Sequence, residues 1–436
     1  MRLSRAALGA TAAVALIVAT PGAASAGAAG PGGSTRLLSR SVTGRPGEAG
    51  SVQPAISRDG SVVAFASIAE DLVPGDTNRL SDVFLIDRSG AGSVVLVSHA
   101  MDGGPANGES SRVSVSGDGP YMTFLSRATN LVAEPTKGLL QVYLYDRTAD
   151  TISLVSRNDD GLAGDADSVS ASVSGTGAFV AFASKATNFV TDSAKRHTNV
   201  YRRDIVAATT TLISKSVLGR PANKDSFDPS IDDSGSEVAF ASYASNLFHD
   251  DKTGHLDVFL SDRAAEVSLI SRTPGGAPAN GFNYGPSISG NGRFIAFSSD
   301  ASDLAQPDTN GATDVFVRNL RTDHTRLLST APSGDSANSD SSAESINRRG
   351  DVVTFESYAT DLVVGDVNDF ADVFVRKGSG AVQLVSSGVD GAPSDGESDA
   401  SAVNSSGRVI VYQSVATNLV RDDDNGAYDV FLNRRP

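Results

Sequence analysis

The chain has 436 residues, a formal net charge of −15 at pH 7 and no cysteine. Without cysteine it can form no disulfide, carry no cysteine-linked lipid and use no thiol nucleophile. Its negative charge repels phosphate groups, so a nucleic-acid partner is not expected, and anionic lipid and acidic polysaccharide are disfavoured as well.

The first 26 residues are predicted to be a signal peptide. Arg2 and Arg5 precede an apolar run at 12–19, and small residues at 24–26 form a cleavage site. The apolar run is too short to cross a bilayer and no later stretch is long enough, so we expect no membrane span. We therefore expect a secreted, extracellular protein in which a flexible Gly/Ala/Pro-rich linker at 27–34 precedes the folded part.

Residues 35–436 repeat one pattern seven times. In the first period, short strands are predicted at 54–57, 62–67, 82–87 and 94–98, with Gly, Asp, Asn or Pro at the junctions and no helical periodicity. The third strand of each period opens with an acidic or amide residue, then Val and an aromatic. These openings are spaced 57 to 59 residues apart, at Asp82, Gln141, Asn199, Asp257, Asp314, Asp372 and Asp429. Four antiparallel strands per period predict an all-β fold, a single seven-bladed β-propeller.

The two ends of this repeat region predict how the ring closes. Residues 35–39 are similar to a fourth strand, whereas the chain ends on a third strand at 429–433. We therefore expect the N-terminal strand to complete the last blade, with Leu37 and Leu38 beside Phe431 and Leu432. This pairing removes an exposed sheet edge.

The repeat resembles the TolB-like propeller repeat, a relative of WD-repeat propellers. The resemblance lies in the Ser-x-x-Gly turn, the Val-Ala-Phe-x-Ser strand and the Asp-Val-Phe-Leu-x-Asp-Arg strand, and it covers nearly all of 35–436. It implies the fold and little about activity, because the family includes binding scaffolds, peptidase gating domains and carbohydrate-active enzymes. TolB itself has a separate N-terminal domain and six blades. This sequence shows neither, so a role in membrane translocation is not transferred.

The loop before the third strand predicts calcium as a cofactor in five periods. A carboxylate stands at its first and seventh positions and, in four of the periods, an amide at its third, and oxygen ligands of this kind suit a hard cation. The candidate ligands are Asp76, Asn78, Asp82, Asp251, Asp257, Asp308, Asn310, Asp314, Asp366, Asn368, Asp372, Asp423, Asn425 and Asp429. The second and third periods lack the pattern. The alternative is that these residues only close turns through the backbone.

A few residues depart from the repeat and are candidates for a site. His249 and His255 share one loop, while His197 and Tyr284 stand in other periods. Their convergence at the mouth of the central channel would favour an enzyme. No Gly-x-Ser-x-Gly, HExxH or P-loop motif is present, and the sequence identifies no catalytic residue.

These observations favour a secreted, monomeric binding or interaction module over an enzyme. Its ligand would be a protein or an extracellular glycan, held on the face that carries the Asp/Asn loops and the long loops between blades. One alternative is a carbohydrate-active enzyme, a polysaccharide lyase or glycoside hydrolase, with its site at the mouth of the central channel. Another is a structural cell-surface protein with no small ligand.

Overall fold

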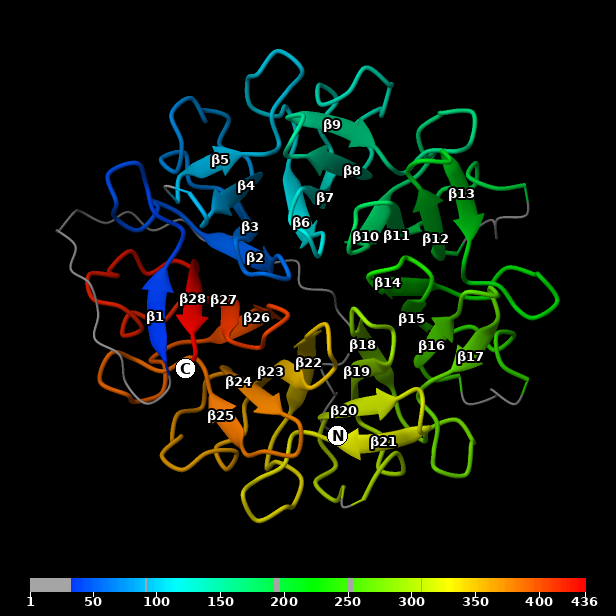
Figure 1. The fold of residues 1–436 in the computed structure, drawn as a ribbon, viewed down its shortest axis with the longest axis vertical. Coiled ribbons are helices and arrows are strands. Elements are labelled where there is room, and N and C mark those ends of the chain that lie inside the picture. Colours follow the sequence, from blue (N-terminus) through cyan, green and yellow to red (C-terminus); the bar gives the residue numbers. More distant parts are fainter. Residues whose placement is uncertain (1–32, 91, 192–196, 250–253, 307) are drawn as a thin grey trace, which may run out of the picture.

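The structure is a computed structural model that describes residues 33–90, 92–191, 197–249, 254–306 and 308–436. The predicted signal peptide and most of the predicted linker lie outside these residues. Within them the chain forms seven antiparallel sheets of four strands arranged in a ring (Figure 1). The predicted seven-bladed propeller is therefore confirmed.

Each blade has a strand next to the channel, two middle strands and an outer strand, and blades 1 to 7 follow chain order. The inner strands are β2 (Ser51–Ile56), β6 (Ser110–Val115), β10 (Ser168–Val173), β14 (Ser226–Ile231), β18 (Asn283–Ile288), β22 (Ser341–Ile346) and β26 (Ser398–Val403). The second strands are β3 (Val62–Ser67), β7 (Tyr121–Ser126), β11 (Phe179–Ser184), β15 (Val238–Ser242), β19 (Phe294–Ser299), β23 (Val352–Ser357) and β27 (Val409–Ser414). The third strands are β4 (Asp82–Asp87), β8 (Gln141–Asp146), β12 (Asn199–Asp204), β16 (Asp257–Ser261), β20 (Asp314–Asn319), β24 (Asp372–Lys377) and β28 (Asp429–Arg434). The outer strands are β5 (Val94–Leu96), β9 (Thr151–Leu154), β13 (Thr209–Leu212), β17 (Val267–Leu269), β21 (His324–Leu327), β25 (Val382–Leu384) and β1 (Ser34–Leu37).

A pair of stacked aromatic rings joins the second and third strands of every blade. Phe65 and Phe84 in blade 1 are directly opposite in the ladder, with ring centroids 5.8 Å apart. Tyr412 and Phe431 form the same pair in blade 7, at 5.7 Å. All four side chains are buried. Because both faces of a blade are apolar, stacking blades around the ring buries them.

The ring closes as the sequence predicts. β1 pairs antiparallel with β28, with Leu37 opposite Phe431, and the Leu38 N–H donates to the Val430 carbonyl at 2.7 Å. The Ser39 hydroxyl continues the contact by donating to the Asp429 carboxylate. The last blade thus takes its outer strand from the N-terminal end of the propeller.

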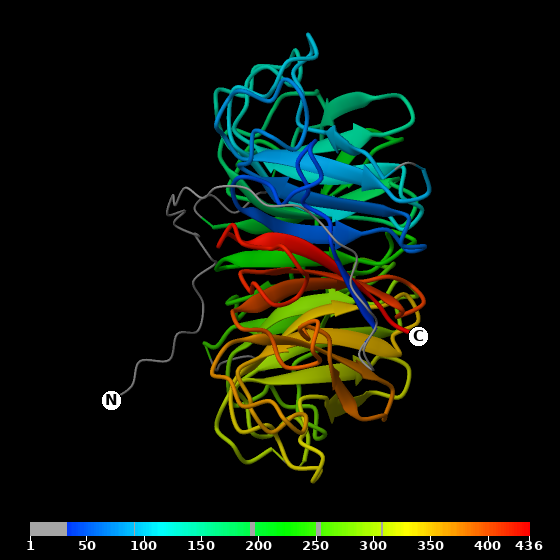
Figure 2. The ribbon, with the colours of Figure 1, turned by 90° about the vertical axis from the view of Figure 1, so that its left-hand side faces the viewer.

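The disc has two different faces. On one, which we call the turn face, lie the short turns that join first to second and third to fourth strands, together with the C-terminus; Figure 1 looks onto this face. The long loops that join second to third strands, and one blade to the next, lie on the opposite loop face, and Figure 2 shows the disc edge-on. In the part of the chain that the structure describes, no helix is long and apolar enough to cross a membrane.

The turn face depends on close packing at its glycines. Gly177, in the Ser-x-x-Gly turn of blade 3, has φ +76°, a conformation that L side chains rarely adopt. A Cβ there would lie 2.2 Å from the ring of Tyr121 in blade 2. Tyr121, which distinguishes the second period in sequence, therefore has a packing role at the junction between two blades.

Candidate functional site

The seventh-position aspartates of the Asp/Asn loops are fully buried and hydrogen bonded. In blade 5 the Ser329 hydroxyl donates to Asp314 Oδ1 at 2.5 Å and accepts from the Val315 N–H at 2.9 Å. In blade 1 the Ser98 hydroxyl donates to Asp82 Oδ1 at 2.5 Å in the same way. Each aspartate therefore ties the start of the third strand to the serine that follows the fourth strand.

The third-position asparagines complete this connection. Asn310 Nδ2 donates to Asp314 Oδ2 at 2.8 Å and to the Ala337 carbonyl at 2.7 Å, while its Oδ1 accepts from the Ala312 N–H. Asn78, Asn368 and Asn425 make the equivalent contacts with their own aspartates. The turn-making interpretation of these residues thus has a physical basis, because each amide joins a loop to the connection leading into the next blade.

The first-position aspartates place a second carboxylate near the seventh. Asp76, Asp308, Asp366 and Asp423 are each between 5% and 7% exposed. Burial and then the charge of Asp423 raise the pKa of Asp429 to about 8, and burial and then the charge of Asp372 raise the pKa of Asp366 to about 6. Two buried carboxylates that repel each other favour either a proton or a cation between them.

Two atoms bear directly on whether a cation fits. Asp76 Oδ1 and Asp366 Oδ1 are buried and have no hydrogen-bond partner. A second observation argues against a cation. Each third-position asparagine turns its NH₂ group, which cannot bind a cation, toward the seventh-position carboxylate. The candidate loop of blade 4 is described only in part, because Asp251 lies outside the described residues. In this loop the Asp257 carboxylate accepts hydrogen bonds from Ser271 at 2.6 Å and from Asn283 at 3.0 Å. Among the described residues, no group of three or more His, Cys, Asp or Glu could hold a metal ion.

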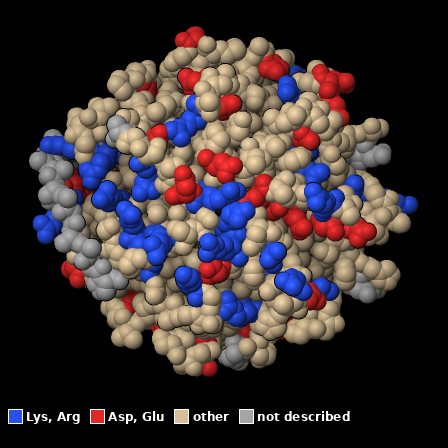
Figure 3. All heavy atoms as spheres, viewed as in Figure 1, with Lys and Arg blue, Asp and Glu red and all other residues tan. Residues whose placement is uncertain are grey.

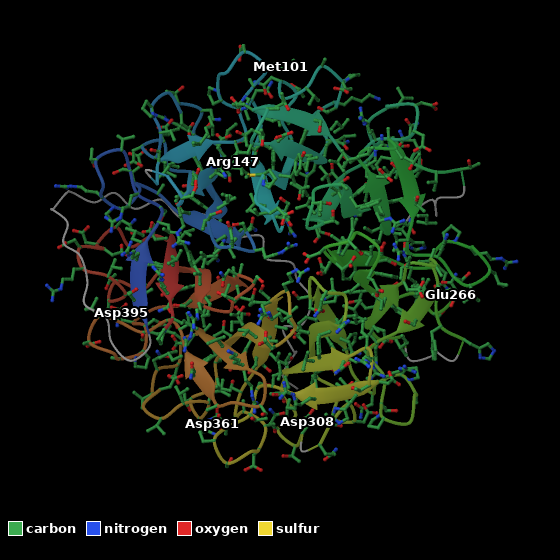
Figure 4. The ribbon with its side chains drawn as sticks, in the orientation of Figure 1. Met101, Arg147, Glu266, Asp308, Asp361 and Asp395 are labelled. Carbon is green, nitrogen blue, oxygen red and sulfur yellow. The ribbon has the colours of Figure 1, made fainter. Side chains whose placement is uncertain are left out.

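Many other acidic residues on the loop face join neighbouring loops at the rim. The Asp395 carboxylate accepts from the N–H and the hydroxyl of Thr417 at 2.7 and 2.8 Å, and Asp361 accepts from the Asn338 N–H at 3.0 Å. Figure 4 shows these two aspartates and Asp308 toward the outside of the ring. These three acidic residues of the loop face therefore lie at the outer rim, away from the channel mouth where the enzyme alternative places its site.

The channel itself contains a cavity of about 410 Å³ lined by inner strands of blades 1, 2, 3, 6 and 7. The pairing register of every inner strand shifts near its middle. Gln53, Arg112, Asp228 and Ala400 have φ between 48° and 55° at these shifts, although none is glycine. Gln53, Arg112 and Ala400 line the cavity, and strain of this kind gathers at functional sites.

Glu344 lines the channel and belongs to a group of interacting carboxyls of blades 6 and 7 that sequence reasoning missed. Burial, then the charge of Glu356, raise the pKa of Glu344 well above its usual value. Burial, then the charge of Asp399, raise the pKa of Glu356 to about 7. Asp399 has a pKa of about 6, raised by burial and opposed by a hydrogen bond from Gln413. The signal in the sequence is weak: Glu344 stands at an inner-strand position where the other blades have Pro, Val, Ala or Ser.

The turn-face mouth of the channel is a separate hollow of about 670 Å³. Its lining includes four basic side chains, Arg58, Arg349, Lys377 and Arg408. Figure 3 shows Lys and Arg gathered around the centre of this face, although the whole chain is acidic. The net charge, being a sum over both faces, concealed this separation.

The residues that depart from the repeat do not form one site. His197 Nδ1 lies 3.7 Å from Asp225 at the junction of blades 3 and 4, and the His255 ring lies 4.9 Å from that of Phe282 at the next junction. The Tyr284 hydroxyl donates to Thr313 Oγ1 at 3.2 Å within blade 5. These contacts belong to three separate places on the ring, so they give no support to a shared catalytic centre.

Comparisons with known proteins establish the fold alone. A scan of protein-family models and a search of curated proteins found no match. An oligogalacturonate lyase from Vibrio parahaemolyticus is 12% identical, with a TM-score of 0.55 over 93% of this chain and 94% of that one. The β-propeller domain of the Trilobed protease from Pyrococcus furiosus is 9% identical, with a TM-score of 0.54 over 88% and 95%. That domain has an open velcro topology, whereas β1 pairs with β28 here.

TolB from Acinetobacter baumannii also matches, at 16% identity and a TM-score of 0.39 over 64% of this chain. The chain spans 54% of the length of that protein. The seven-bladed ring and the matches to the lyase and to the protease propeller confirm the expected propeller fold.

Proposed function

We propose that the chain is an exported, monomeric binding module whose ligand, a protein or an extracellular glycan, is held at the central channel. The observation that carries this proposal is the channel cavity of about 410 Å³, which is lined by the strained residues Gln53, Arg112 and Ala400 of three blades. A rigid ring with variable side chains at its centre is a scaffold for recognition. Binding is preferred to catalysis because the unusual histidines and Tyr284 lie at separate places on the ring.

Blocking the channel tests this proposal. Ser170 lines the cavity, so Ser170→Trp should fill part of it, and we expect at least about tenfold weaker binding to whichever glycan an array of extracellular glycans identifies for the wild type. Leu218→Trp adds the same side chain at a residue that is 77% exposed on the loop face, and should leave binding unchanged. Equal affinity of both variants and the wild type would remove the channel from the proposal.

A second candidate function is cleavage of an extracellular glycan. It is favoured by the interacting carboxyls of Glu344, which lines the channel, Glu356 and Asp399, because cleavage of a glycosidic bond commonly uses one protonated and one ionised carboxyl group. The shared shape with an oligogalacturonate lyase is in keeping with it. Mass spectrometry of glycans incubated with the wild type should then show products that Glu344→Gln and Glu356→Gln no longer release; intact glycans would exclude this candidate.

We also propose that calcium binds at the Asp/Asn loops, with Asp76 and Asp82, or their equivalents, as carboxylate ligands. The unpartnered Asp76 Oδ1 and Asp366 Oδ1 support this, and calcium would supply the positive charge that the paired carboxylates lack. Asn310→Asp provides the test. In chelator it should lower the melting temperature, because it replaces the donor that faces Asp314 with another carboxylate. Calcium should then raise the melting temperature of the variant by more than that of the wild type. An unchanged melting temperature in both proteins would leave only the turn-making role.

A further inference from the structure

The turn-face mouth is a rigid basic hollow. Its wall is built from first-to-second strand turns that hydrogen bond around the channel: the Arg58 N–H donates to the Gly117 carbonyl, and the Ser405 N–H donates to the Arg58 carbonyl, both within 2.9 Å. The Asp118 N–H continues the series into blade 3 by donating to the Gly175 carbonyl at 3.1 Å. Because the backbone of the mouth is fixed, a ligand would bind there with little loss of conformational entropy.

Three of the four cations of the mouth are available to a ligand. Arg349, Lys377 and Arg408 are exposed and form no ion pair with the described residues, in contrast to Arg58, which pairs with Asp118 at 2.9 Å and Asp233 at 2.8 Å. The acidic residues near these cations already have other hydrogen-bond or ion-pair partners.

Asp233 also takes the guanidinium of Arg348 at 2.7 Å, and Asp59 accepts from the hydroxyls of Ser57 and Ser61 at 2.7 and 2.8 Å. Further out on the same face, Arg88 lies close enough to Arg36 and Arg434 for their charges, after burial, to lower its pKa. The lining therefore holds four basic side chains against two acidic ones, Asp59 and Asp118, and the mouth keeps an excess of positive charge.

The acidity of the loop face does not cancel this excess. An inner strand has six residues and rises about 3.3 Å per residue, so the two faces are roughly 20 Å apart. The Debye length at physiological ionic strength is about 8 Å, so charges on one face are largely screened from the other. An anion that approaches the turn face meets the local basic charge.

The lining also indicates the kind of anion. The hollow of about 670 Å³ is far larger than a single phosphate, and its three cations without an ion pair, Arg349, Lys377 and Arg408, come from two blades, 6 and 7. Ser405 and Ser406 stand between the cations, and their hydroxyls can hydrogen bond to sugar hydroxyls. Among the residues that the structure describes, no aromatic side chain lines the mouth, so these residues offer no stacking surface for nucleic-acid bases.

We propose that the turn-face mouth binds an acidic polysaccharide, a chain whose repeated carboxylate or sulfate groups contact Arg349, Lys377 and Arg408. This inference rests on the proposed binding function and assigns a ligand class to the mouth, a hollow separate from the channel cavity. It also reverses what net charge alone suggests, because recognition depends on the charge of one face.

The test compares polygalacturonate with the same polymer after complete methyl esterification, which removes the charge and keeps the sugar backbone. The wild-type chain should bind the acidic form, with an affinity that falls as salt rises, and should not bind the ester. The triple variant Arg349→Gln, Lys377→Gln, Arg408→Gln should bind at least about tenfold more weakly, because it loses all three ion pairs with the acidic groups of the polymer.

A matched control removes two arginines and one lysine from the other face. Arg220→Gln, Lys224→Gln, Arg421→Gln changes exposed residues of the loop face by the same total charge and should keep wild-type affinity. Equal losses in the two triple variants would overturn the placement. Binding of the ester as tightly as the acid, or of a neutral glycan or single-stranded DNA in preference to acidic sugars, would overturn the ligand class while leaving the binding function standing. Failure to bind any glycan or protein would overturn both.

Discussion

Removal of the closing strand should destabilise the propeller more than any other small change. A mature chain that begins at Ser39 loses β1, and with it the four-residue pairing to β28 and the buried side chain of Leu37, which is 4% exposed. Losing one buried leucine and several backbone hydrogen bonds costs on the order of 5 kcal/mol. We expect a large fall in the melting temperature and, because the edge of β28 is then exposed, association of the protein into dimers or aggregates.

A chain that begins at Gly33 is the control, because it removes only residues outside the described structure. It should keep the melting temperature and the elution volume of the full-length protein. Calorimetry and size-exclusion chromatography measure both quantities. If the shorter chain that starts at Ser39 were as stable as this control, β1 would contribute nothing to closure.

The stability of the calcium-free protein should fall as the pH rises from about 5 to 8. Burial raises the pKa of Asp82 to about 6, of Asp314 to about 7 and of Asp429 to about 8, whereas in the unfolded chain each lies near 3.8. Between these values the folded state binds more protons than the unfolded state, so unfolding becomes easier as the pH increases. Melting curves in chelator should show a fall of several degrees across this range.

The variant Asp423→Asn tests whether the raised pKa values of the buried aspartates cause this pH dependence. Removing the Asp423 carboxylate takes away a charge that raises the pKa of Asp429, so the melting temperature should depend less on pH than in the wild type. Millimolar calcium should flatten the wild-type curve in the same way if the calcium proposal holds. A melting temperature that rises between pH 5 and 8 in chelator would contradict the expected protonation of these buried aspartates.

The sequence predicts the fold well because each blade has to solve the same packing problem. The Phe of the second strand and the aromatic of the third recur at a fixed spacing since they stack on each other, as Phe65 and Phe84 do. Ring closure is equally visible, because an orphan fourth strand at one end and an orphan third strand at the other can only pair together. Leu37 and Phe431 confirm this pairing.

The sequence predicts the candidate sites less well. It brings Asp76, Asn78 and Asp82 into one loop, but it does not show that the NH₂ group of Asn78, rather than its oxygen, faces Asp82. It does not reveal the mouth formed by Arg349 and Arg408, because these residues stand in turns of two neighbouring blades and come together only when the blades pack. In this propeller the turns and the long loops lie on opposite faces and differ in charge. The net charge of the chain sums over both faces and therefore does not show the difference.

The pairing of β1 with β28 also sets the order of events when the chain is made. Ser39 and Asp429 are 390 positions apart, so the contact between them can form only after the whole chain has been synthesised. Until then the first and last blades each present an unfinished surface, and newly made molecules at high concentration are liable to join one another there. We therefore expect the yield of folded protein to depend on dilution and on chaperones much more than its stability does once folded.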